Sequence, residues 1–141
     1  MTAFHGRCHC GRVTAVFETA RDPAGLEVRA CGCGFCRRHG ARTVSDREGR
    51  LTVEGLDGAL LYRFGLGITD YVICATCGCY VAALMDEADG RRFGIVGVNV
   101  LDDAERFSAP AAPRDYGAED EAARRARRRR LWTPVAPTAL A

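Results

Sequence analysis

The chain has 141 residues, 48% of them hydrophobic, which is enough for one compact domain with a buried core. Its 20 basic residues are all arginines and nearly balance 18 acidic residues, and a formal net charge of +2 does not by itself predict a nucleic-acid-binding protein. The sequence has no run of about 18 apolar residues, so no membrane span is predicted. The first residues lack the apolar stretch of a signal peptide, and we expect a cytoplasmic location.

Short β-strands are predicted along most of the chain. Segments rich in β-branched or aromatic residues alternate there with glycine, aspartate or proline, which is typical of strands separated by turns. The predicted strands are Val13 to Glu18, Leu26 to Ala30, Arg42 to Ser45, Arg50 to Glu54, Ala59 to Phe64, Tyr71 to Ile73, Tyr80 to Met85 and Arg92 to Val100.

The pattern changes in the last part of the chain. Pro110 and Pro113 predict an extended connection, and Gly117 to Arg130 is predicted to be a helix, with acidic residues near its start and arginines near its end, as the helix dipole favours. We therefore predict a mainly β fold with a C-terminal α-helix. Residues 1–109 form the β domain, and residues 110–141 form an extended segment and a helix packed on the same domain.

The arginine-rich run from Arg124 to Arg130 is interpreted as a solvent-exposed helix end, although such a run could also contact nucleic acid. The tail after Trp132 is not expected to be regular, and Trp132 is expected to anchor it on the domain. The expected i,i+4 ion pairs are Asp120 with Arg124 and Glu121 with Arg125.

The eight cysteines are the clearest functional signal. Seven fall in three tight groups: Cys8-x-Cys10, Cys31-x-Cys33-x-x-Cys36 and Cys74-x-x-Cys77. A reducing cytosol disfavours disulfides, whereas close cysteines can direct two sulfurs at one metal ion from a tight turn. The sequence therefore predicts metal binding, with two Zn²⁺ ions.

Groups of two, three and two cysteines suggest one natural division of the ligands. Cys8, Cys10, Cys74 and Cys77 make a closed structural site, and Cys31, Cys33 and Cys36 make a three-sulfur site with an open position. Cys79 leaves an alternative open, because it could complete a second four-cysteine site with the middle group. It could also be a buried thiol that binds no metal.

An open three-cysteine site favours thiol chemistry over hydrolysis. Three thiolates weaken the Lewis acidity of Zn²⁺, but the ion can still bind a further thiol and favour its deprotonation. Arg37, Arg38 and Arg42 follow Cys36 closely and could bind a substrate carboxylate, or could be solvated surface residues.

Three motifs resemble one known family in order and spacing: Gly6-x-Cys8-x-Cys10-Gly11, Cys31-x-Cys33-x-x-Cys36-Arg37 and Cys74-x-x-Cys77-Gly78. Together with Tyr62-Arg63-Phe64 and Val98-Asn99-Val100-Leu101-Asp102, they resemble the glutathione-dependent formaldehyde-activating enzyme family, which also includes centromere protein V. The resemblance implies a β-tent fold and the ligand division given above, with the three-cysteine site as the catalytic one. It also implies an activity, the condensation of formaldehyde with glutathione to S-(hydroxymethyl)glutathione. This is the reaction of a carbon–sulfur lyase run in the direction of bond formation.

On this basis the chain is interpreted as a carbon–sulfur lyase that adds glutathione to formaldehyde or another small aldehyde, working as a monomer or homodimer. Cys31, Cys33 and Cys36 are the expected catalytic ligands, with Arg37 and Arg38 as substrate-binding residues. His39 is the expected proton donor, although it could also be a zinc ligand or an exposed loop residue. The competing interpretation is a non-catalytic, zinc-stabilised module that binds a protein or nucleic-acid partner.

Overall fold

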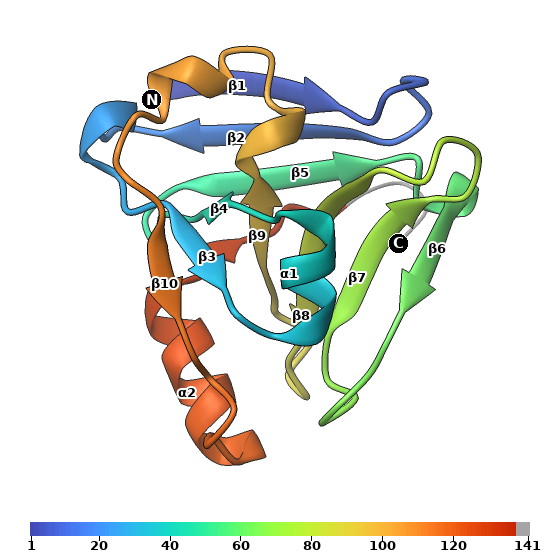
Figure 1. Cartoon of the computed structure of the whole chain (residues 1–141), viewed down its shortest axis with the longest axis vertical. Helices are drawn as coiled ribbons and strands as arrows, with labels where there is room; N and C mark the ends of the chain where they lie inside the picture. The colour runs from blue at the N-terminus through green and yellow to red at the C-terminus, as the bar shows by residue number, and fades with distance from the viewer. Residues whose placement is uncertain (138–141) are drawn as a thin grey trace.

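A computed structural model describes residues 1–137 of the chain, and within them strands dominate. Two sheets make up the fold (Figure 1). The smaller sheet is an antiparallel array of β1 (Thr2–Arg7), β2 (Thr14–Thr19) and β5 (Arg50–Glu54). Strand β1 was not predicted, because its second buried residue is Gly6 and only Phe4 is a large apolar residue, so the alternation in burial is not visible in the sequence.

The larger sheet has the strand order β10-β3-β4-β9-β8-β7-β6, and β11 pairs with β9. Neighbouring strands are antiparallel except β10, which runs parallel to β3. The bounds are β3 (Arg29–Cys31), β4 (Thr43–Val44), β6 (Ala59–Tyr62), β7 (Asp70–Cys74), β8 (Tyr80–Asp86), β9 (Arg92–Gly97), β10 (Ala112–Arg114) and β11 (Thr133–Pro134). The predicted mainly β fold with a C-terminal helix is confirmed, while the division of the chain at residue 109 stays a prediction.

The main core lies between the two sheets. Phe4 and Phe17 from the small sheet pack with Phe107, with ring centroids 5.1 Å and 6.3 Å from the Phe107 ring. A second, smaller cluster contains Met85, Phe93 and Trp132. Trp132 is buried there, so the prediction that it anchors the tail is confirmed.

The predicted C-terminal helix is present as α2 (Glu121–Leu131). It begins later than predicted because the Asp120 side chain accepts a hydrogen bond from the Ala123 amide at 2.8 Å and so caps the first turn. The predicted pair between Asp120 and Arg124 is therefore wrong, since Arg124 pairs with Glu119 instead. The pair between Glu121 and Arg125 is confirmed at 3.0 Å.

Two further differences concern short elements. The helix α1 (Gly34–His39) was not predicted, because six residues are too few for a periodic pattern. The tail after Trp132 was predicted to be irregular, but Thr133 and Pro134 form β11, which pairs with β9, and Val135 forms a bridge with Leu51. Short 3-10 helices occur at Pro23–Gly25, Leu56–Gly58, Val98–Val100 and Ala104–Arg106. Within residues 1–137, neither α-helix is long and apolar enough to cross a bilayer.

Helix α1 lies in front of β8 and β9 in the view of Figure 1, between β3 and β7. Its Phe35 ring packs on the rings of Tyr71 from β7 and Tyr80 from β8, at centroid distances of 4.7 Å and 5.0 Å. The larger sheet therefore fixes α1, and with it the middle cysteine group, against one of its faces.

Candidate metal centres

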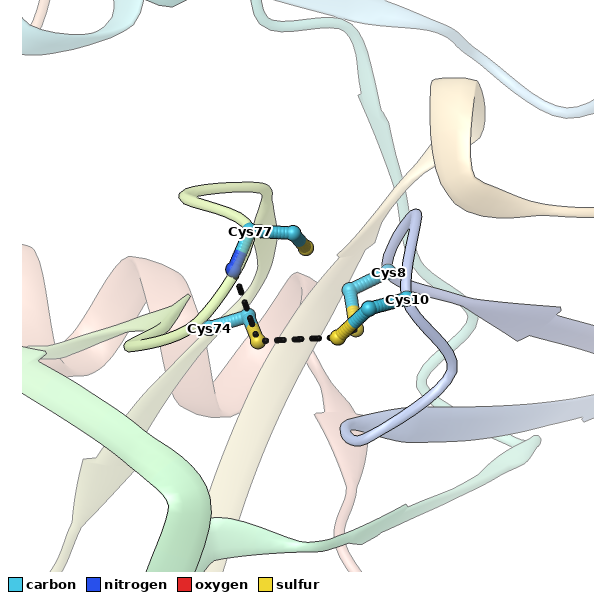
Figure 2. A group of neighbouring side chains, drawn as sticks. All are labelled: Cys8, Cys10, Cys74 and Cys77. Carbon is cyan, nitrogen blue, oxygen red and sulfur yellow. Dashed lines mark hydrogen bonds between the residues drawn. The ribbon is translucent and has the colours of Figure 1, made fainter.

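The first and third cysteine groups meet in space. The Sγ atoms of Cys8, Cys10, Cys74 and Cys77 all lie within 4.8 Å of one another, and they point toward a common centre from two separate turns (Figure 2). The Sγ atoms are 3.7 Å apart for Cys8 and Cys10, and 3.6 Å apart for Cys10 and Cys74. A tetrahedral Zn²⁺ with bonds of about 2.3 Å to sulfur places its ligands about 3.8 Å apart. The donor set therefore fits zinc, and the cysteines are free rather than joined in disulfides.

Backbone groups direct hydrogen bonds at these sulfurs. The amides of Thr76 and Cys77 donate to Cys74 Sγ at 3.4 Å and 3.5 Å, and the Val13 amide donates to Cys8 Sγ at 3.3 Å. A backbone hydrogen bond from Cys10 contributes most to lowering the pKa of Cys77, to about 5. Donors aimed at sulfur favour the thiolate, which is the form that binds a metal.

The middle group lies at the junction of β3 and α1. The Sγ atoms of Cys31, Cys33 and Cys36 also lie within 4.8 Å of one another. Cys33 is the N-cap of α1, and its sulfur accepts from the Cys36 amide at 3.3 Å. Gly40 ends the helix with a left-handed backbone (φ 58°), which glycine adopts without strain. A sulfur N-cap and a glycine C-cap thus bring three thiols together within six residues of sequence.

Cys31 and Cys36 differ in the acidity of their thiols. Cys31 accepts a hydrogen bond from the Cys36 thiol, which lowers the pKa of Cys31 to about 5. The same contact, together with burial, raises the pKa of Cys36 above its ordinary value. One thiolate can therefore form readily, and a metal must displace the remaining protons when it binds all three sulfurs.

Two cavities open on the middle group and share the residues Cys31, Tyr71, Tyr116 and Arg128. An inner cavity of about 50 Å³ is further lined by Cys36, Arg29, Thr43, Tyr80, Arg127 and Trp132, among others. An outer cavity of about 620 Å³ is further lined by Cys33, Phe64, Pro113, Arg114 and Arg124, among others. The first and third cysteine groups line neither cavity.

Three polar groups of the inner cavity are buried: the Tyr80 hydroxyl, Arg29 and Arg128. Burial raises the pKa of the Tyr80 hydroxyl well above its ordinary value, so that it stays protonated and can donate a hydrogen bond. Burial also lowers the pKa of Arg29, and it lowers that of Arg128 to about 10, which still leaves Arg128 charged at neutral pH.

His39, Arg37 and Arg38 are exposed at the end of α1 and line neither of these two cavities. The His39 ring packs on Phe35 at 4.4 Å, and Arg38 donates to the Gly34 carbonyl at 3.1 Å. Their proposed roles in proton transfer and substrate binding stay predictions.

The interpretation of the arginine run as a solvent-exposed helix end is wrong for three of its members. Arg128 is buried, and Arg124 and Arg127 pair with Glu119 at 3.3 Å and 2.7 Å while lining the cavities. Sequence reasoning also missed Arg29, although its position two residues before Cys31 on a strand places both side chains on one face.

Cys79 belongs to neither sulfur group. Its sulfur accepts a hydrogen bond from the His9 amide at 3.4 Å, beside the first cysteine group, and it does not gather with Cys31, Cys33 and Cys36. The alternative of a second four-cysteine site is therefore not the arrangement found.

Comparison with known proteins agrees with this geometry. A crystal structure of a Rhodobacter sphaeroides protein, a structural genomics target, is similar at 30% identity and a TM-score of 0.55, covering 77% of this chain and 99% of that chain. No curated protein matches the chain. The sequence profile of the glutathione-dependent formaldehyde-activating enzymes matches residues 3–116. The chain thus belongs to the glutathione-dependent formaldehyde-activating enzyme family.

Proposed function

We propose that the protein is a zinc-dependent carbon–sulfur lyase that adds a thiol, glutathione, to formaldehyde or another small aldehyde. The observation that carries the proposal is the difference in access between the cysteine groups. Cys31, Cys33 and Cys36 open on two cavities, whereas the four-cysteine group lines neither of them. Family membership supports the choice of glutathione and formaldehyde.

The residues have distinct tasks in this proposal. Cys8, Cys10, Cys74 and Cys77 hold a structural zinc, and Cys31, Cys33 and Cys36 hold a second ion. When bound there, zinc supplies an open coordination position that favours the thiolate form of a substrate thiol. The outer cavity is large enough for the thiol, because ligand pockets span about 300–1,000 Å³. Arg114 and Arg124 line its wall and each already pairs with one carboxylate, Glu27 or Glu119, so the remaining N–H groups of these arginines are the donors left for a glutathione carboxylate.

The reaction itself is an addition without redox change. The thiol sulfur bonds to the carbonyl carbon, the carbonyl π bond breaks, and the oxygen takes up a proton. His39 is one candidate donor, and the buried Tyr80 hydroxyl is a second, because it lines the inner cavity with Cys31 and Cys36. Replacing each in turn, as His39→Gln and Tyr80→Phe, separates the two assignments: the donor is the residue whose loss lowers kcat.

Nucleic-acid binding through α2 is the weaker alternative. Arg124 and Arg127 pair with Glu119, Arg125 and Arg129 pair with Glu87, and Arg128 is buried. Phosphate binding requires accessible cations, and few of the helix arginines are available. The cytoplasmic location and the monomeric or homodimeric state remain predictions from the sequence.

The test compares two cysteine variants of the zinc-loaded protein. We expect Cys36→Ala to abolish the acceleration of S-(hydroxymethyl)glutathione formation, followed by NMR, while Cys79→Ala keeps it. If Cys36→Ala accelerates the reaction as well as the parent protein, or if the parent protein gives no acceleration, the lyase assignment fails and a non-catalytic zinc-stabilised module becomes the better account.

A further inference from the structure

The inner cavity contains two buried cations that have no carboxylate partner within the described residues. Arg29 is 8% exposed and Arg128 is 5% exposed. Within residues 1–137, the ion pairs of the structure include neither of them. Arg29 donates to the Ser45 hydroxyl, while Arg128 donates to Thr69 and stacks on the Trp132 ring at 4.1 Å. Neutral partners of this kind leave both charges uncompensated, and burying such charges is costly.

Two buried polar atoms of the same cavity wall have no hydrogen-bond partner in the described part of the chain. They are the Tyr80 hydroxyl and the Nε of Arg128. Buried donors of this kind normally have a partner, so their convergence on one cavity indicates a ligand that accepts hydrogen bonds there. Such a ligand presents an anionic or carbonyl oxygen to each group.

The lack of a carboxylate partner distinguishes Arg128 from four other arginines of α2. Glu119 pairs with Arg124 and Arg127, and Glu87 pairs with Arg125 and Arg129. Within residues 1–137, acidic residues thus pair with four other arginines of α2 but not with Arg128. A zinc ion on three thiolates carries one net negative charge, so the guanidinium groups of Arg29 and Arg128 leave one positive charge for a substrate.

We propose that the inner cavity is a carboxylate site, and that the preferred carbonyl substrate is a small aldehyde bearing a carboxylate, an α-oxo acid. Arg29 and Arg128 bind the carboxylate, and Tyr80 donates to the carbonyl oxygen. A guanidinium matches a carboxylate with two parallel hydrogen bonds, whereas uncharged formaldehyde offers neither a negative charge nor a pair of acceptor oxygens. The substrate class rests on the proposed function, whereas the carboxylate site does not.

The volume of the inner cavity agrees with a site in which the small acid binds in the inner cavity and the thiol binds in the outer cavity. A cavity of about 50 Å³ has room for only a few water-sized groups, so it excludes a tripeptide but admits a two-carbon acid. The thiol in the outer cavity then adds to the carbonyl carbon where the cavities meet, at Cys31 and Tyr71. The new carbon–sulfur bond replaces the carbonyl π bond, the oxygen gains the thiol proton, and the carboxylate is unchanged.

The first experiment measures binding without reaction. Oxamate has the shape of a small α-oxo acid but an unreactive carbonyl, and its binding to the zinc-loaded protein can be followed by NMR titration. We expect Arg128→Met and Tyr80→Phe each to weaken oxamate binding at least tenfold. Arg125→Gln, a helix arginine outside both cavities, should change it less than twofold. Zinc content and circular dichroism establish that each variant is folded, and Tyr80→Phe keeps the test valid if Arg128→Met does not fold.

The second experiment compares aldehydes in the presence of glutathione. We expect kcat/KM to be higher for glyoxylate than for formaldehyde, and Arg29→Gln to reduce that ratio at least tenfold. Thiol adducts from formaldehyde without any oxamate binding would overturn the carboxylate site and leave the proposed lyase standing. Oxamate binding that depends on Arg128, with no adduct from either aldehyde, would support the carboxylate site and overturn the lyase.

Discussion

The two cysteine groups use the same donor atom in different structural settings. Four sulfurs come from two turns, after β1 and after β7, that lie more than sixty residues apart in sequence, and they face each other across the fold. The other three come from one continuous segment, Cys31 to Cys36, beside two cavities. Under the proposed function, this difference assigns the roles: a metal that joins distant turns would stabilise the fold, and a metal held by one short segment beside the cavities would be free to bind a substrate thiol.

The largest expected effect comes from Cys74→Ala. A structural zinc site contributes on the order of 10 kcal/mol in small zinc-binding peptides, which is comparable to the whole stability of a domain. We expect the variant to lose zinc and to be unfolded at 25 °C by circular dichroism. Cys79→Ala is the matched control, since it removes a nearby sulfur outside both groups and should stay folded. A folded Cys74→Ala protein would contradict the structural role of the four-cysteine site.

A smaller effect on stability is expected from Cys36→Ala. The four-cysteine group is intact in this variant, so the protein should keep one zinc ion and its circular dichroism spectrum. It should lose the second ion and the uptake of glutathione, because only two sulfurs remain in the middle group. Metal analysis and glutathione titration provide the measurement. Unfolding as complete as that of Cys74→Ala would show that the roles of the two groups are wrongly assigned.

Glycines that follow the two groups offer a milder comparison. Gly78 (φ 80°) and Gly40 (φ 58°) are left-handed, and neither has an atom within 4 Å of an added Cβ, so only backbone strain opposes alanine. We expect Gly78→Ala and Gly40→Ala each to lower the free energy of unfolding by about 1–2 kcal/mol. Gly78→Ala should weaken the first zinc and Gly40→Ala the second, in a chelator titration. Gly25→Ala is the control, because an added Cβ there also has no atom within 4 Å and the φ of Gly25 is not left-handed, so the free energy of unfolding should hardly change. If Gly78→Ala and Gly40→Ala each weakened both zinc ions equally, the separation of the two sites would be contradicted.

The smallest expected effect on stability comes from Glu119→Gln. This carboxylate holds Arg124 and Arg127 at the cavity walls, and partly exposed pairs contribute at most about 1 kcal/mol. We expect the melting temperature to change little and the Kd for glutathione to rise severalfold, as measured by calorimetry. Glu121→Gln, whose partner Arg125 lines neither cavity, should leave the Kd unchanged. A Kd that is the same in both variants would show that Arg124 does not contribute to the thiol site.

Much of the fold and the grouping of the sulfurs could be predicted from local sequence. Cysteine spacing depends on turn geometry, and alternation of apolar residues identifies most strands. The helix α1 escaped detection, because its N-cap is Cys33, which is not a usual capping residue, and only Gly40 after it is a helix-end signal.

The lining of the cavities could not be predicted in the same way. Whether an arginine of α2 faces solvent or the sulfur group depends on how the helix packs on the sheet, and no local pattern encodes that packing. Arg128 is buried against Thr69 and Met85, which lie in distant parts of the sequence, and Tyr80 meets the site only after β8 joins the sheet. These are tertiary contacts between residues far apart in the sequence, and the local sequence pattern does not predict which of those residues meet.

The most direct test of unequal coordination is zinc K-edge X-ray absorption on the fully loaded protein, with and without glutathione. The account predicts an average of about 3.5 sulfurs per zinc without thiol, rising to about 4 when glutathione is added. Four sulfurs per zinc before any thiol is added, or a coordination number that glutathione leaves unchanged, would contradict it.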